Sequence, residues 1–145
     1  MKSLYITILA IFMVSIGYSQ SKKNVFFDQS TLIGKFHTID ELEDLKKGEL
    51  IKLYKQRINE IITVLPYLAL TNEAGVKLSD IGIKENSGNL KSLDKHHEAT
   101  LKALENTNDL ITELIPYADT EKIIWAILYF EEVIKKIRIG ASGNF

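Results

Sequence analysis

The sequence predicts an all-α fold: a small antiparallel bundle of about four main helices with a short leading helix. Three observations lead to this prediction. Apolar residues recur every three or four positions over long stretches, as on one face of a helix. Helix-capping residues precede these stretches, and glycine or proline follows them. The links are short, which favours antiparallel neighbours. With 145 residues, 46% of them apolar, the chain has the size and composition of one domain.

The first residues, "MKSLYITILAIFMVSIGYSQ", have the pattern of an export signal. An early lysine supplies positive charge, and the apolar run 4–16 is shorter than the roughly 20 residues that span a bilayer. Gly17 and Ser19 suit an export peptidase. We therefore predict a signal peptide, residues 1–19, cleaved between Ser19 and Gln20. The product is a periplasmic or extracellular chain with no transmembrane segment; the alternative is an uncleaved N-terminal anchor.

Three further segments follow the signal. Residues 20–37 form a polar, mostly extended lead-in, with an apolar patch at 25–27 that either docks on the core or is mobile. Residues 38–140 form the helical bundle, and residues 141–145 form a flexible tail.

The bundle begins with a short helix. Thr38 and Glu41 have the spacing of a capping box. Gly48 then interrupts the helical pattern, because glycine weakens a helix relative to alanine. We therefore expect a short helix followed by a bend.

The next helix is longer and carries a clear apolar stripe. Its members are Leu50, Tyr54, Ile58, Ile61, Leu65 and Leu68. The charged residues Arg57 and Glu60 lie mostly off this stripe. Pro66 falls near the end of the pattern and is expected to kink or stop the helix.

Residues 76–83 predict a further helix end. Gly82 can take the left-handed C′ position, which brings Ile83 against Leu78. A short strand is the alternative, since the apolar residues partly alternate. After the following loop, Ser87 and Asn89 are both suitable N-caps for the longest helix.

That longest helix ends near Pro116. Its stripe comprises Leu90, Leu93, His97, Leu101, Leu104, Asn108, Ile111 and Ile115. Asn108 either fixes helix register from a buried position or lies at the edge of the stripe near water.

The last helix starts at Asp119 or Thr120, either of which can cap it. Its run "IIWAILYF" is apolar on nearly every side, and a helix of that kind is expected to lie centrally. We therefore predict that the helix containing Trp125 is the central one, and that Gly140 supplies its C′ residue.

Two Pro-Tyr pairs, Pro66-Tyr67 and Pro116-Tyr117, contain the only prolines of the chain. Each follows an apolar helical run, so the pairs predict two similar helical hairpins, each bent at a Pro-Tyr corner. A duplication and the shared needs of helix ends both account for the likeness. In the structural interpretation, proline sets a bend near a helix end, and tyrosine packs its ring inside while its hydroxyl stays in water. The functional alternative is a ligand clamp formed by Tyr67 and Tyr117.

Few residues suggest chemistry. Asp94 and His97, three positions apart, resemble half of a carboxylate-histidine metal site, but the chain has no second such pair and no HExxH. A histidine satisfied by hydrogen bonds is the simpler interpretation. Glu131 and Glu132 are expected in a solvated stretch, and no spacing calls for acid-base work. We therefore predict no catalytic residues, no cofactor and no resident metal.

Composition narrows the partners. A net charge of -1 gives no field that attracts nucleic acid, and the absence of cysteine excludes disulfides. We expect a non-enzymatic envelope protein that binds another protein: a second copy, a larger complex, or a toxin that it neutralises. The first alternative is a carrier of an apolar ligand bound between helices, with Tyr54, Tyr67, Tyr117 and Trp125 as candidate contacts. The second alternative is a metal-binding protein built around His97.

Overall fold

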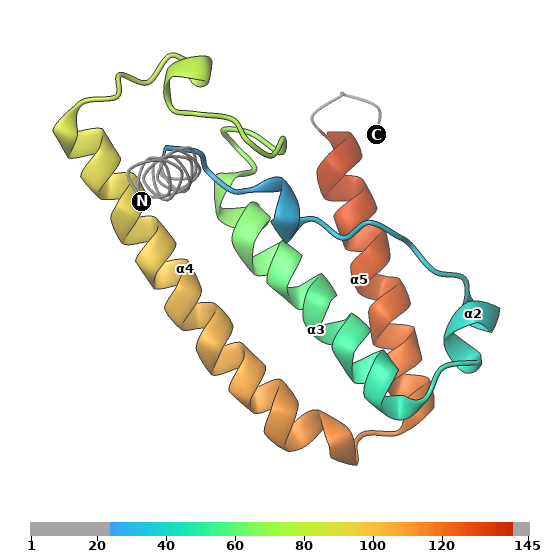
Figure 1. Ribbon diagram of the computed structural model, residues 1–145. Helices are drawn as coiled ribbons and strands as arrows, with labels where there is room; N and C mark the ends of the chain where they lie inside the picture. Colours follow the sequence, from blue (N-terminus) through green and yellow to red (C-terminus); the bar gives the residue numbers. More distant parts are fainter. Residues whose placement is uncertain (1–23, 141–145) are drawn as a thin grey trace, which may run out of the picture.

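The computed structural model describes residues 24–140, and this part of the chain is an all-α bundle, as predicted. The long helices are α3 (Lys47–Val64), α4 (Ser87–Leu114) and α5 (Thr120–Gly140), with the short α2 (Ile39–Glu43) before them. The three long helices lie side by side in one layer with α3 in the middle (Figure 1). The predicted signal peptide, residues 1–19, the start of the lead-in and the tail 141–145 lie outside the described residues.

The central helix is α3, so the prediction that the helix with Trp125 is central is wrong. α3 packs against both α4 and α5, whereas α5 forms one edge of the layer and packs on α3 and α2. The apolar run in α5 had suggested burial on every side. In the structure, part of that run faces away from the bundle.

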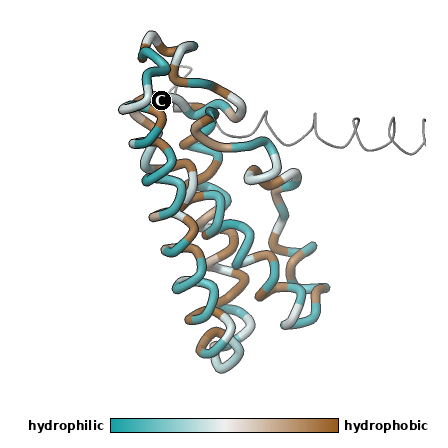
Figure 2. The backbone as a smooth tube through the Cα atoms, turned by 60° about the vertical axis from the view of Figure 1, so that its left-hand side comes forward, coloured by the Kyte–Doolittle hydropathy of each residue, from teal (hydrophilic) through white to brown (hydrophobic). Residues whose placement is uncertain are grey.

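Residues 24–38, which we call the strap, cross one face of this layer. The strap and α2 lie on the same side of the three long helices (Figure 2). The strap is extended apart from one 3-10 turn, η1 (Gln29–Thr31). Its apolar patch, Val25, Phe26 and Phe27, is buried, and the Phe26 N–H donates to the Val76 carbonyl at 3.0 Å. The patch therefore docks on the core.

Local capping signals account for the helix starts. The capping box of α2 is present: the Thr38 N–H donates to Glu41 Oε2 at 3.0 Å, and the Glu41 N–H donates to Thr38 Oγ1 at 3.4 Å. Gly48 lies in the first turn of α3, so the break between α2 and α3 comes before it. α4 is the longest helix, as predicted, but its N-cap is Asn86 rather than Ser87 or Asn89.

Both prolines end an α-helix, as predicted. α3 passes into the 3-10 turn η2 (Leu65–Tyr67), and α4 passes into η4 (Ile115–Tyr117). Each turn has its proline near the start, where the missing N–H costs least.

Residues 76–83 contain a shorter helical element than predicted. The 3-10 turn η3 (Ser79–Ile81) ends at Gly82, whose φ is 81°. The Ile83 N–H then donates to the Leu78 carbonyl at 2.9 Å, which is the predicted closure on a 3-10 turn instead of an α-helix. Gly140 is the last residue of α5 in the structure, so it is helical and does not take the predicted C′ position after the helix.

The core consists of two apolar clusters, one toward each end of the layer. One cluster contains Phe26, Phe27, Val64, Tyr67, Leu78, Leu93 and Ile137. The other contains Leu42, Leu50, Ile123, Ile124 and Ile127. Between the two clusters, α3 buries the charged side chains of Arg57 and Glu60, and α5 buries Glu131 together with Ile134.

Candidate interaction surface

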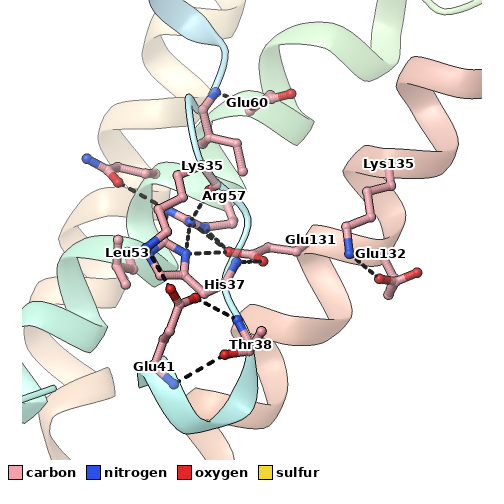
Figure 3. A network of polar contacts seen from close by, with 12 residues as sticks. Lys35, His37, Thr38, Glu41, Leu53, Arg57, Glu60, Glu131, Glu132 and Lys135 are labelled. Carbon is pink, nitrogen blue, oxygen red and sulfur yellow. Dashed lines mark hydrogen bonds and ion pairs between the residues drawn. The ribbon is translucent and has the colours of Figure 1, made fainter. Parts of the chain in front are cut away.

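A buried ion pair joins α3 to α5 beneath the strap (Figure 3). Arg57 Nη2 and Nε donate to Glu131 Oε1 at 2.7 and 3.0 Å. Arg57 Nη2 also donates to the Lys35 carbonyl at 3.0 Å, and Glu131 Oε2 accepts the His37 N–H at 2.7 Å. Both side chains are almost completely buried. The pair therefore binds the backbone of the strap on both its donor and its acceptor sides.

A second pair repeats this arrangement with the charges exchanged between the helices. Glu60 on α3 accepts from Arg138 Nε and Nη2 on α5, at 3.0 and 2.8 Å. Glu60 Oε2 accepts the Ile33 N–H at 2.6 Å, and Arg138 Nη2 donates to the Ile33 carbonyl at 3.0 Å. Arg138 differs from Arg57 in being 28% exposed.

The two pairs explain how an extended segment is held on a helical surface without a sheet. Buried backbone N–H and C=O groups need partners. Val25 forms an antiparallel bridge with Lys77, but residues 33–37 of the strap have no neighbouring strand within the described part of the chain. Here the carboxylates accept their N–H groups and the guanidinium groups donate to their carbonyls. Attachment of the strap therefore accounts for the buried charges, and no catalytic role is needed to explain them.

Three members of this network were misplaced by the sequence analysis. Arg57 and Glu60 were placed mostly off the buried stripe, and Glu131 in a solvated stretch, but all three are buried. A sequence signal does exist. Arg57 and Glu60 are three residues apart, and Glu131 and Arg138 are seven apart, so each couple lies on one face of its helix.

The His37 ring supplies a further hydrogen bond to Glu131. Its Nδ1 lies 3.1 Å from Glu131 Oε1 and 3.0 Å from Arg57 Nη2. The two hydrogens of Nη2 already point to Glu131 and to the Lys35 carbonyl. The consistent tautomer therefore carries its proton on Nδ1 and donates to Glu131. Glu131 then has hydrogen-bond partners on both of its carboxylate oxygens.

His97 is held by the strap. Its Nε2 lies 3.0 Å from the Phe26 carbonyl, which fits the interpretation of a satisfied histidine. Asp94 is exposed, and the His96 ring packs near Tyr67. Within residues 24–140 no group of three or more histidine, cysteine, aspartate or glutamate side chains is placed to hold a metal ion.

Two grooves open to solvent lie between α4 and the strap. One, of about 420 Å³, is lined mainly by apolar side chains, including Phe26, Leu101 and Leu104, with His97 among them. The other, of about 610 Å³, is more polar and runs past Asn59 and Arg57. They share Thr31, Thr63 and Leu104, so they form neighbouring parts of one channel-like surface.

The four predicted aromatic contacts do not gather at one site. Tyr54 packs on Phe130, with ring centroids 5.5 Å apart. Tyr67 is buried among Phe26 and Phe27, and burial raises its pKa. Tyr117 is 86% exposed. None of the four lines these two grooves, but Tyr67 lines a smaller hollow of about 230 Å³, together with Leu93 and His96, beside the start of α4.

The fourth, Trp125, belongs to an exposed aromatic pair on α5. Its ring stacks on Tyr129, with centroids 5.5 Å apart and planes 12° from parallel. Trp125 is 67% exposed and Tyr129 is 55% exposed. On a helix these positions lie opposite Ile127, Glu131 and Ile134, the side chains that α5 buries.

We call Lys122, Trp125, Tyr129, Glu132 and Lys136 the outer face of α5. All five are exposed, and they are spaced by three and four residues. Tyr129, Glu132 and the flanking lysines were not singled out as partner contacts by the sequence analysis. The spacing was visible in the sequence, but it was interpreted as part of an all-round apolar helix.

Comparison of the chain with protein-family models, with curated proteins and with solved structures gave no match. None of the helices in residues 24–140 combines the length and apolarity that crossing a bilayer requires.

Proposed function

We propose that this chain is an exported, non-enzymatic protein-interaction module that binds its partner through the outer face of α5. The observation that carries the proposal is the exposed Trp125–Tyr129 stack. Tryptophan and tyrosine are enriched among the hot spots of protein interfaces, because they bury a large area at a low entropic cost. A large aromatic side chain left two-thirds exposed on a rigid helix is therefore a ready anchor.

The buried charges support a binding role rather than catalysis. Arg57, Glu131, Glu60 and Arg138 hold one another and the strap backbone. Catalytic acids and bases need access to a substrate. Here the buried carboxylates and guanidinium groups are engaged in hydrogen bonds that hold the strap to the helices.

Site-specific photo-crosslinking tests the binding surface. A benzoylphenylalanine is placed at position 125 in one variant and at Lys102, exposed on α4, in a matched control. After irradiation of living cells, we expect a discrete protein adduct from position 125 and none from position 102. Adducts that form equally at both positions, or only at 102, refute the proposed surface.

Export rests on the pattern of residues 1–19. Intact mass of the chain recovered outside the cytoplasm is expected to correspond to a start at Gln20. A recovered mass that includes Met1 to Ser19 contradicts cleavage at this position.

A second candidate function is the binding of an apolar ligand in the groove between α4 and the strap. The groove of about 420 Å³ favours it, because Leu101 and Leu104 present apolar side chains to an open space of ligand size. The test is a titration with the fluorescent probe N-phenyl-1-naphthylamine. We expect Leu101→Asp to lower probe binding at least tenfold and Leu110→Asp, on an exposed part of α4 outside both grooves, to leave it unchanged. Equal binding by the two variants excludes this site.

A further inference from the structure

The outer face of α5 has the residue spacing of a helix-pairing seam. Lys122, Trp125, Tyr129, Glu132 and Lys136 follow one another by three, four, three and four residues. This alternation keeps side chains on one line along a helix and is the repeat by which two helices pack. The line lies on the exposed side of α5, at the edge of the helical layer, where no other described helix covers it.

The seam is complementary to itself when it is reversed. In an antiparallel pair related by a twofold axis midway between Trp125 and Tyr129, Trp125 of one copy faces Tyr129 of the other. Lys122 then faces Glu132 of the second copy. One step to the side, Glu121 faces Lys135 of the second copy. In these two pairs a cation meets an anion, and each aromatic ring meets another. Lys136 lies beyond this symmetric part of the seam, because the position that it would face precedes α5 of the second copy.

We propose that two copies of this chain form a twofold-symmetric dimer through antiparallel pairing of their α5 helices. This inference rests on the proposed function, because it names the partner of the same surface. An unrelated partner gives no reason for opposite charges at equal distances on either side of the aromatic pair. A second copy requires that arrangement, since both halves of a twofold interface come from one sequence.

The charged side chains are free to change partners. Lys122 is paired with Asp119 at 3.2 Å and Glu132 with Lys135 at 2.6 Å, both within one chain. Three of these four side chains are 62–78% exposed, and exposed pairs contribute little to stability. Lys135 is 39% exposed, and its Nζ also lies 5.2 Å from the centre of the Phe36 ring. Glu132 is ionised at neutral pH, since the usual pKa of a glutamate lies well below 7 and the Lys135 hydrogen bond lowers it further.

Charge reversal tests the proposed pairing. Lys122→Glu places two glutamates opposite each other at each end of the seam, and Glu132→Lys places two lysines there. We expect each variant alone to dimerise at least tenfold more weakly than the unaltered chain. An equimolar mixture of the two is expected to restore dimers, because every opposed pair then carries opposite charges.

Two measurements follow the assembly. Sedimentation velocity gives the dimer fraction over a dilution series. Trp125 is the only tryptophan of the chain, so its fluorescence reports on this surface alone. Its emission is expected to shift to shorter wavelength as the concentration rises and the ring leaves water.

Trp125→Ala is expected to abolish the dimer, and circular dichroism establishes that the variant keeps its helices. Its control is Leu110→Ala, an exposed apolar residue on α4 that lies off the seam. We expect that control to dimerise like the unaltered chain.

Three outcomes overturn the inference: a monomer at all concentrations, a dimer that survives Trp125→Ala, or a mixture of charge variants that stays monomeric. Crosslinking from position 125 separates these from a failure of the proposed function. An adduct with a different protein refutes the dimer and keeps the binding surface, whereas no adduct and no dimer refutes both.

Discussion

Removing the charge of Glu131 is expected to be far more damaging than removing that of Glu60. The two glutamates are matched: each is buried, each binds one arginine, and each accepts one backbone N–H of the strap. Glutamine keeps an oxygen that accepts such a bond. Glu131→Gln and Glu60→Gln therefore differ in the arginine that each leaves without a countercharge, and in the His37 ring, which hydrogen-bonds to Glu131 alone.

The solvent exposure of that arginine determines how much stability each substitution removes. The side chain of Arg57 is only 2% exposed, whereas that of Arg138 is 28% exposed. Breaking a buried ion pair by removing one partner costs about 3–5 kcal/mol, because a buried charge is left unpaired. We expect that loss for Glu131→Gln. For Glu60→Gln, where water reaches the arginine, we expect about 1–3 kcal/mol.

Urea unfolding followed by far-ultraviolet circular dichroism measures both losses. The native spectra and the dependence on urea must match those of the unaltered chain, so that the change lies in stability and not in compactness. A typical domain has only about 5–15 kcal/mol to lose. If Glu60→Gln is as damaging as Glu131→Gln, or more so, the argument from buried charge is refuted.

Four further predictions concern single residues. Thr38→Ala is expected to cost about 1 kcal/mol of unfolding free energy through loss of the α2 cap, measured by urea unfolding; no loss refutes the cap. The hydrogen bond from Lys35 lowers the pKa of Glu41 below 4.5, so the contribution of Glu41 to the free energy of unfolding is present above that pH and is lost in acid. Glu41→Gln is therefore expected to make stability fall less steeply as the pH is lowered. An unchanged acid dependence contradicts this. The buried Tyr67 hydroxyl has no hydrogen-bond partner, and burial raises its pKa above 10.0. The contribution of the neutral hydroxyl to the free energy of unfolding is therefore present below that pH and is lost as the pH rises through the pKa of the folded state. Tyr67→Phe is expected to be neutral or stabilising at pH 7 and to lessen the alkaline loss; a destabilised variant contradicts the assignment. Pro66→Ala, at an exposed position, is expected to change stability by less than about 1 kcal/mol and to keep the helix content; a large loss of helix signal means that the bend itself supports the packing.

The helices were predictable because they depend on local chemistry. The Thr38–Glu41 capping box and the two helix-ending prolines act over a few residues, so the sequence contains their whole cause. The left-handed Gly82 was predictable for the same reason. The element that it ends was not, because three residues of 3-10 helix and one turn of α-helix differ little in sequence.

The strap and its charged network were not predictable in the same way. Arg57 is buried because residues 33–38 cross α3 and α5 at that level, and those elements are far apart in the sequence. An analysis of hydrophobic periodicity assigns charged residues to the solvent-exposed face of a helix. It contains no information about the backbone of the strap, whose N–H and C=O groups need hydrogen-bond partners. Only the reciprocal order of charges, Arg57 before Glu60 and Glu131 before Arg138, pointed to the network.

The wrong prediction about α5 has a physical explanation in the proposed dimer. The sequence indicated a helix that is apolar on nearly all sides and should be central. In one copy that helix lies at the edge, with Trp125 and Tyr129 exposed. Antiparallel pairing of two outer faces would join the layers of both copies edge to edge and place the two α5 helices in the middle. The apolar pattern would then describe the environment of α5 correctly, at the level of the assembly and not of the single chain.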